Sequence, residues 1–207
     1  MNQSEQQVIG LFPSPLMIFS YLDDYSKELD WIKKCKCEKD PYYNKQSVDT
    51  FILDNPELKN IRIFIEDKLD QFVSQIYGSK NKLVITQSWV NKSGKGESHH
   101  EHTHPNSVIS GVWYPQINEN LPPIEFRNKL QRDMELSIDQ YNCFNSGIMS
   151  LPVQRGQLIL FPSNISHGVA VNRINDERIS LSFNTWVKGN LGSIDTLTYL
   201  PLDKIMA

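Results

Sequence analysis

The spacing of hydrophobic and polar residues changes once along the chain. In the N-terminal part, two stretches place apolar side chains three or four positions apart, which predicts helices with one buried face. The first covers about 23–39 and the second about 55–78, where Asn55 is placed as an N-cap and Pro56 as the first helical residue. An apolar run before them, residues 11–19, is interrupted by two prolines and suits an edge strand.

After Lys82 the pattern changes to short β-branched and aromatic runs separated by Gly, Pro and Asn. These runs predict strands near 83–91, 108–115, 123–128, 156–162, 167–172 and 178–187. Many short strands after two helices indicate a mainly β (α+β) fold: a double-stranded β-helix, or cupin-like jelly roll, with N-terminal helices packed against it. The span 129–155 suits a further strand plus a loop, and the tail from Gly189 is irregular.

The length and composition predict one soluble domain over residues 1–207. Residues 1–80 would supply an edge strand and supporting helices, and residues 83–187 the β-helix core. A net charge of −3 gives no support for a nucleic-acid or membrane partner. We find neither a signal peptide nor an apolar run of roughly 20 residues. Three cysteines, an odd count, fit reduced thiols, so we expect a cytoplasmic protein.

Four of the five histidines lie within residues 99–104. Neutral imidazole suits Zn, Cu, Fe and Ni, and a face of two histidines and a carboxylate with open positions indicates a non-haem Fe(II) oxygenase. Alternate residues of an extended segment project to the same side, so His100, His102 and His104 could share one direction. The fifth histidine, His167, begins a predicted strand and could bring a third ligand. The other interpretation is a surface cluster that binds metal by accident.

Arg178 and Ser180 follow His167 at positions of one strand that face the same way. An arginine inside a small barrel is costly unless an anion pairs with it. Its planar guanidinium suits a carboxylate, and a serine hydroxyl adds another donor. The alternative is a salt bridge to Asp176 or Glu177. Considered together with the histidines, the pair favours an oxo-acid site beside an iron ion.

With these motifs, the chain resembles the 2-oxoglutarate–Fe(II) dioxygenase superfamily, whose members include prolyl hydroxylases, and more closely the oxygenases found in marine bacteria and cyanophages. The likeness runs from Leu11 to Trp186 and is loose over 116–150. The matching pieces are LFPSPL (11–16), SWVN (88–91), HTHPNSVISGVWY (102–114), GQLILFPSNISHGV (156–169) and ERISLSFNTW (177–186).

The resemblance implies a role for six residues. The His-x-Asp/Glu…His pattern of the superfamily falls on His102, His104 and His167, which would bind Fe(II). Its Arg-x-Ser pattern falls on Arg178 and Ser180, and the tyrosine of prolyl-hydroxylase-like members falls on Tyr114. These three residues would hold the distal carboxylate of 2-oxoglutarate.

One departure from the family pattern is that histidine occupies the position of the carboxylate ligand. Three neutral imidazoles leave the charge of the ion uncompensated until an anion binds, and 2-oxoglutarate would supply that anion. A different register, His99-x-Glu101, would restore a histidine–carboxylate pair. We prefer the register of His102 and His104 because the following Pro-Asn-Ser turn matches the family.

The resemblance implies a dioxygenase that uses Fe(II), 2-oxoglutarate and O2, and that hydroxylates a C–H bond while releasing succinate and CO2. Trp89, Asn91, Asn184 and Trp186 could shape the pocket, although aromatic residues on strands are more often part of the core. The substrate, a small molecule or a side chain, cannot be read from the sequence, and the oligomeric state, a homodimer included, stays open. If the chain is phage-encoded, its compartment would be the host cytoplasm.

Three other functions are compatible with the motifs. They are a cupin-type three-histidine dioxygenase that needs no 2-oxoglutarate, a non-catalytic jelly roll that binds zinc, and a phage structural protein.

Overall fold

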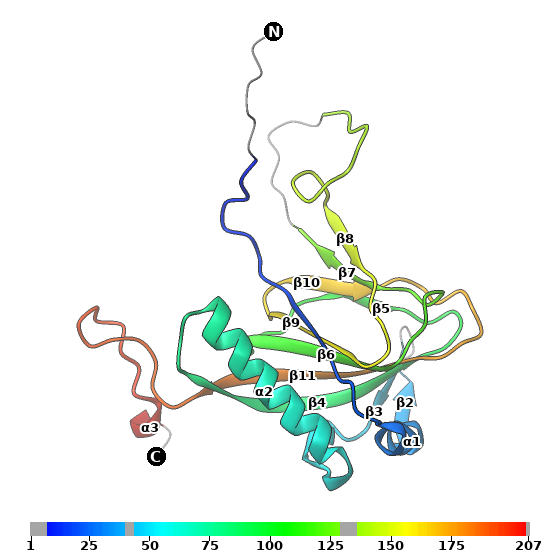
Figure 1. The fold of residues 1–207 in the computed structure, drawn as a ribbon, viewed down its shortest axis with the longest axis horizontal. Helices are drawn as coiled ribbons and strands as arrows, with labels where there is room; N and C mark the ends of the chain where they lie inside the picture. Colours follow the sequence, from blue (N-terminus) through cyan, green and yellow to red (C-terminus); the bar gives the residue numbers. More distant parts are fainter. Residues whose placement is uncertain (1–7, 40–43, 129–135, 206–207) are drawn as a thin grey trace.

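The computed structural model describes residues 8–39, 44–128 and 136–205. Its β-strands form two antiparallel sheets that face each other as a double-stranded β-helix (Figure 1). The seven-stranded sheet has the order β1-β9-β6-β11-β4-β3-β2, and the four-stranded sheet has the order β5-β10-β7-β8. The predicted fold class is thereby confirmed.

The strands have the following bounds. The larger sheet contains β1 (Met17–Ser20), β2 (Cys37–Lys39), β3 (Lys45–Ser47), β4 (Lys82–Ser93), β6 (Ile109–Gln116), β9 (Gln157–Pro162) and β11 (Arg178–Lys188). The smaller sheet contains β5 (His99–His102), β7 (Ile124–Arg127), β8 (Ile148–Leu151) and β10 (Ser166–Val169).

The helices cover the outer face of the larger sheet (Figure 1). They are α1 (Ser26–Lys34) and α2 (Lys59–Ile76), and the short 3₁₀ helices η1 (Ile52–Asp54) and η2 (Pro56–Leu58) precede α2. A separate turn near the C-terminus forms α3 (Leu202–Ile205). The apolar residues of α2 recur every three or four positions and are buried against the sheet. No helix in the described part of the chain has both the length and the apolar character needed to cross a bilayer.

Two predicted helix boundaries were wrong. The first helix ends at Lys34, because Cys35 adopts an extended backbone and residues 37–39 then pair with β3. The second helix begins at Lys59, because Asn55 caps the 3₁₀ turn of Pro56 instead, accepting a hydrogen bond from the Glu57 N–H at 3.1 Å. Tertiary pairing and a local cap therefore override the apolar period at these ends.

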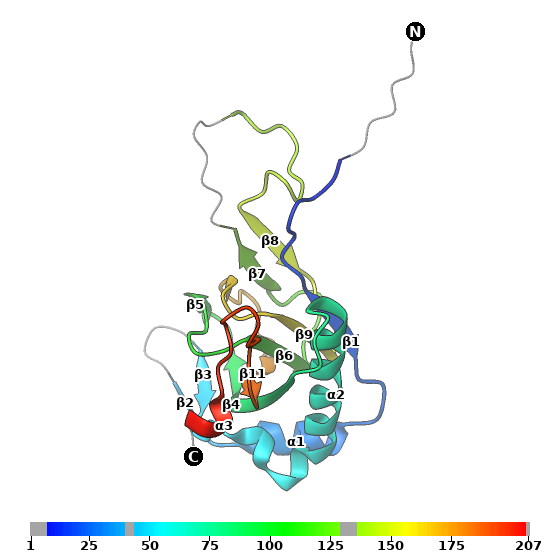
Figure 2. The ribbon, with the colours of Figure 1, turned by 90° about the vertical axis from the view of Figure 1, so that its left-hand side faces the viewer.

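The strand β8 occupies part of the span that the sequence left open, and it forms a hairpin with β7 that projects from the body of the protein (Figure 2). The N-terminal strand β1 pairs with β9 at the edge of the larger sheet, as the prolines before it suggested. Residues 40–43, which follow the first predicted helix, and residues 129–135, which are part of the 129–155 span, lie outside the described residues.

Candidate active site

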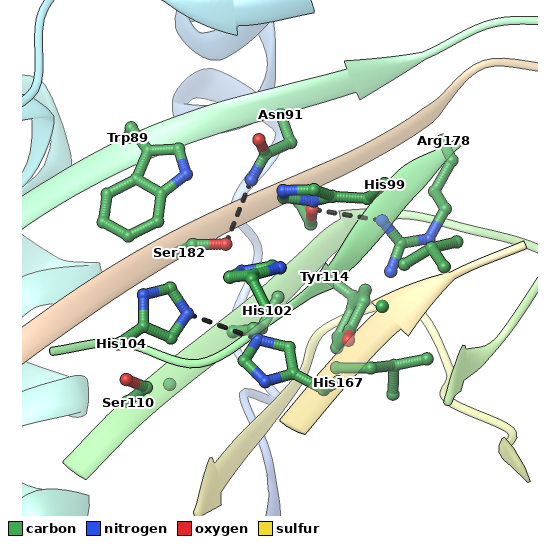
Figure 3. Close-up of a pocket in the computed structure, with 16 residues that line it drawn as sticks. Trp89, Asn91, His99, His102, His104, Ser110, Tyr114, His167, Arg178 and Ser182 are labelled. Atoms are coloured by element: carbon green, nitrogen blue, oxygen red, sulfur yellow. Dashed lines mark hydrogen bonds between the residues drawn. The ribbon is translucent and has the colours of Figure 1, made fainter. Parts of the chain in front are cut away.

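A pocket lies between the two sheets (Figure 3). Its walls combine imidazoles, an arginine and small polar side chains from strands of both sheets. The lining residues are Trp89, Asn91, His99, His102, His104, Ser110, Gly111, Val112, Tyr114, Ile124, His167, Gly168, Val169, Arg178, Ser180 and Ser182.

Strand β11 supplies one wall through simple alternation. Arg178, Ser180 and Ser182 line the pocket, whereas the residues between them belong to the core beneath the helices. The polar residues of the sequence RISLSF therefore face the pocket, and its apolar residues face the core. Ser182 was not singled out from the sequence, although it is the next residue in the same alternation.

Two paired strands of the smaller sheet bring the histidines together. His102 on β5 lies opposite His167 on β10, and their ring centroids are 4.5 Å apart. His104 follows β5 by two residues, and its backbone N–H donates to the Ser163 carbonyl at 3.0 Å. The turn that follows includes Asn106 with a φ of 56°, a left-handed conformation that asparagine tolerates better than most residues.

The nitrogen positions of these three histidines fit a single metal ion. Each offers a ligand nitrogen within 4.8 Å of the others, and the Nε2 atoms of His104 and His167 are 3.2 Å apart. Two nitrogens bound to one ion at ~2.1 Å and at right angles would lie ~3.0 Å apart, close to that distance.

Backbone carbonyls fix the tautomers of two of the rings. The Nδ1 atom of His102 donates to the His100 carbonyl at 2.8 Å, and that of His167 donates to the Ile165 carbonyl at 2.9 Å. Because Nδ1 carries the proton in each ring, Nε2 keeps a lone pair for a metal. Such second hydrogen bonds are the usual support of metal-bound histidine.

Burial keeps these imidazoles neutral, which is the form that binds metal. It lowers the pKa of His104 to about 3 and that of His167 to about 4, and neighbouring imidazoles add to the effect. The pKa of His102 is lowered for the same reason, against the hydrogen bond to the His100 carbonyl.

A β-bulge changes which other histidine enters the pocket. His167 pairs with His102 but Val169 pairs with His99, so three steps on β5 match two steps on β10. The extra residue resets the alternation: His99 lines the pocket and His100 is exposed. His100 does not line the pocket, although its ring centroid lies 4.9 Å from that of His102.

Gly168 permits this bulge. A Cβ atom at Gly168 would lie 3.0 Å from the His99 carbonyl oxygen and 3.2 Å from that of His100. The backbones of β5 and β10 can approach this closely only because residue 168 has no side chain.

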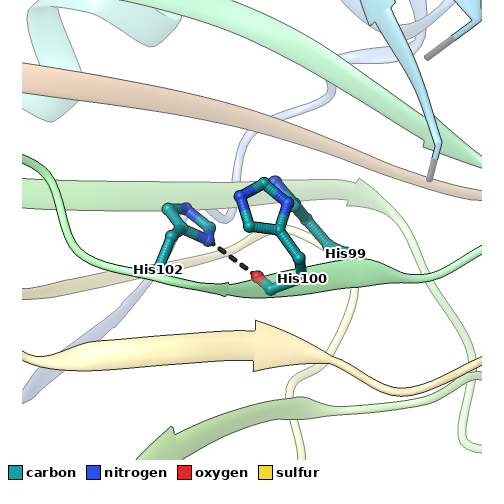
Figure 4. A group of neighbouring side chains, drawn as sticks. All are labelled: His99, His100 and His102. Atoms are coloured by element: carbon teal, nitrogen blue, oxygen red, sulfur yellow. Dashed lines mark hydrogen bonds between the residues drawn. The ribbon is translucent and has the colours of Figure 1, made fainter. Parts of the chain in front are cut away.

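The alternative His99-x-Glu101 register does not form in this structure. The Glu101 carboxylate accepts a hydrogen bond from Ser166 Oγ at 2.6 Å and pairs with Arg127 at 3.2 Å. Glu101 does not line the pocket. His99, His100 and His102 do form a second group with nitrogens within 4.8 Å, and this group shares His102 with the first (Figure 4).

Arg178 and His104 lie in different parts of the pocket (Figure 3). Arg178 is only 3% exposed. Its Nη1 donates to Ser180 Oγ at 3.2 Å, and its guanidinium carbon lies 5.1 Å from the centre of the Tyr114 ring. No carboxylate among the described residues forms a salt bridge with it, and its Nε has no hydrogen-bond partner there. The alternative salt bridge to Asp176 or Glu177 is therefore absent from the structure.

Tyr114 completes this end of the pocket. Its side chain is fully buried, and its hydroxyl also lacks a partner among the described residues. Burial raises the pKa of Tyr114 to about 12, against the opposing influence of the Arg178 charge. The phenol therefore stays protonated at neutral pH and can donate a hydrogen bond. Arg178, Ser180 and Tyr114 are brought together as the sequence predicted.

Trp89 and Asn91 form a further wall of the pocket. Asn91 Nδ2 donates to Ser182 Oγ at 3.1 Å, and the Trp89 ring lies 5.8 Å from that of His104. Asn184 instead accepts a hydrogen bond from Ser110, and Trp186 is 40% exposed; neither lines the pocket. Of the four residues that could shape the pocket, Trp89 and Asn91 thus line it.

Comparison with known proteins agrees with this geometry. Residues 87–184 match a family model described as "Putative 2OG-Fe(II) oxygenase". This segment includes all three histidines, Tyr114, Arg178 and Ser180. No curated protein matches the chain at a significant level.

Solved structures share the fold at low sequence identity. A 2OG-Fe(II) oxygenase family oxidoreductase from Burkholderia pseudomallei superposes with a TM-score of 0.55 at 16% identity, covering 76% of this chain and 75% of that one. HygX from Streptomyces hygroscopicus, solved with nickel, 2-oxoglutarate and hygromycin B bound, gives 0.60 at 8% identity, covering 83% and 82%. A Pseudomonas putida prolyl-4-hydroxylase gives 0.58 at 11% identity, covering 85% and 94%.

These neighbours share the double-stranded β-helix, and the family match falls on the strands that carry the pocket. Residues 87–184 are therefore a domain of the 2OG-Fe(II) oxygenase family.

Proposed function

We propose that this protein is an Fe(II)- and 2-oxoglutarate-dependent dioxygenase that hydroxylates a C–H bond of a small molecule or side chain. One observation carries the proposal: a single pocket contains three converging neutral imidazoles and a buried arginine that has no carboxylate partner among the described residues. A neutral metal-binding face and a buried, unsatisfied cation together suit a chelating ligand that carries two carboxylates. Residues 1–80 and 83–187 would act as one unit, the first supporting the second.

His102, His104 and His167 would hold the iron through Nε2. Bound Fe(II) would supply the redox chemistry for O2 activation. The carbonyls of His100 and Ile165 hold two of these rings in place before metal arrives, since each accepts the Nδ1 proton.

Arg178, Ser180 and Tyr114 would bind the distal carboxylate of the oxo-acid. The guanidinium offers the Nε–H group, which has no partner among the described residues, and both hydroxyls can donate from a buried position. Because no acidic side chain of the described residues joins the three histidines, the anionic co-substrate would also offset the positive charge of the metal. In the overall reaction, substrate, 2-oxoglutarate and O2 would give hydroxylated substrate, succinate and CO2.

The test is an anaerobic titration of the protein with Fe(II) and then with 2-oxoglutarate, followed by the visible metal-to-ligand charge-transfer band. We expect the band in the wild-type protein and at least a ~100-fold weaker affinity for 2-oxoglutarate in Arg178→Met, because a buried charge pair would be lost. Iron binding should not change in this variant.

Arg127→Met is the matched control. Arg127 is also an arginine of the barrel, but it is half-exposed and already paired with Glu101 and Glu125. Its variant should bind 2-oxoglutarate as the wild type does. Tight iron binding without a band in the wild type would contradict the proposal and favour a three-histidine enzyme that works without the oxo-acid.

A further inference from the structure

The bulge between β5 and β10 brings a fourth imidazole into the pocket, and the proposed function gives it no role. His99 would point away from His102 in a regular strand, because residues three apart face opposite sides. The bulge turns it inward instead, and Gly168 leaves room for the displaced backbone. Bulges near active sites commonly redirect a side chain in this way.

His99 lies beside both functional ends of the pocket. Its ring stacks on His102, with centroids 4.7 Å apart and planes at 24°. His99, His102 and Arg178 line the same pocket, and Figure 3 shows the His99 ring between His102 and Arg178. A dicarboxylate that extends from the histidine cluster to Arg178 would pass next to this ring.

The ring of His99 can donate a hydrogen bond. An imidazole carries at least one N–H group whether it is neutral or protonated. A neutral imidazole has one N–H donor and one acceptor. Among the described residues, the ring of His99 packs against the rings of His100 and His102 and makes no hydrogen bond.

We propose that His99 is a co-substrate-binding residue, whose N–H donates to the distal carboxylate that Arg178 and Ser180 hold. This inference rests on the proposed function and adds a selectivity element to it. An additional donor in this pocket would favour oxo-acids with a second carboxylate over those without one. The stacking on His102 fixes the ring plane, which lowers the entropy lost on binding.

The rival role for His99 is metal binding in the group of His99, His100 and His102 (Figure 4). In that group His102 already uses Nδ1 for the His100 carbonyl. The first group also requires the lone pair on the Nε2 atom of His102. The two groups therefore compete for one ring, and the experiment must separate a metal ligand from a co-substrate ligand.

The test uses the Fe(II)-loaded protein under anaerobic conditions and two oxo-acids: 2-oxoglutarate, and 2-oxopentanoate, which lacks the distal carboxylate. In His99→Phe we expect the affinity for 2-oxoglutarate to fall about 10- to 100-fold, as for loss of a hydrogen bond to a charged group. The affinity for 2-oxopentanoate and for Fe(II) should stay within about threefold of wild type, since neither would use the lost donor.

Two further variants keep the result interpretable. His99→Gln retains an N–H donor and should recover part of the affinity for 2-oxoglutarate, whereas His100→Gln changes the exposed neighbour and should bind both oxo-acids as wild type does. Equal weakening of both oxo-acids in His99→Phe, or loss of Fe(II) binding, would overturn the proposal. Absence of the band in the wild type would instead count against the proposed function itself.

Discussion

The two faces of the seven-stranded sheet are both buried, but they are built differently. On β11, Ile179, Leu181 and Phe183 pack beneath the helices in a core of apolar side chains. On the opposite face of the same strand, Arg178, Ser180 and Ser182 line the pocket. Successive residues of one strand thus serve two different environments.

The difference shows which face contributes stability and which contributes chemistry. Apolar residues under the helices gain from burial and need no partner. On the pocket face, Arg178 Nε and the Tyr114 hydroxyl are buried without a hydrogen bond to any described residue. Since unsatisfied buried polar groups are costly, their presence indicates that a ligand supplies the missing partners.

The largest expected effect comes from the helix-facing side. Phe183→Ala should lower the free energy of unfolding by about 3–5 kcal/mol, because Phe183 is fully buried in the apolar core. Fe(II) affinity, measured under native conditions, should change little. Chemical denaturation measures the free energy of unfolding. A loss below 1 kcal/mol would mean that this face is not the main source of stability. Trp186→Ala, on the more exposed end of β11, is the control and should cost less.

A comparable effect should appear as the pH is lowered. The pKa values of His104 and His167 are about 3 and 4 in the folded protein, below the ~6.5 of an unfolded chain. Between these limits the unfolded state binds more protons, so stability should fall as the pH drops from about 6.5 towards 4. Thermal melting of the metal-free protein over this range measures the slope. Replacing His104 with Asn should flatten it, and an unchanged slope would contradict the assigned burial.

The smallest effect should come from the pocket-facing arginine. Arg178→Met removes a buried charge without an acidic partner, so the metal-free protein should be as stable as wild type or more stable by about 1 kcal/mol. Urea denaturation in the absence of iron and oxo-acid measures this change. A clear destabilisation would show that Arg178 is structural and would weaken its assignment to a ligand.

The sequence predicted much of this arrangement because alternation and periodicity are local properties. The strand pattern and the helix-facing core follow from residue spacing, whereas the set of His102, His104 and His167 was implied by the resemblance to the family. That His99 rather than His100 lines the pocket could not be predicted, because a bulge depends on how two distant strands pair. Gly168 was the one available signal, and its meaning appears only once β10 is placed against β5.

The most direct test is a structure of the protein with Fe(II) and 2-oxoglutarate, obtained without oxygen, with the ion located by its anomalous scattering. The account predicts iron roughly 2.1 Å from nitrogens of His102, His104 and His167, and the distal carboxylate of 2-oxoglutarate on Arg178. Iron bound by His99 and His100, or a co-substrate carboxylate away from Arg178, would contradict it.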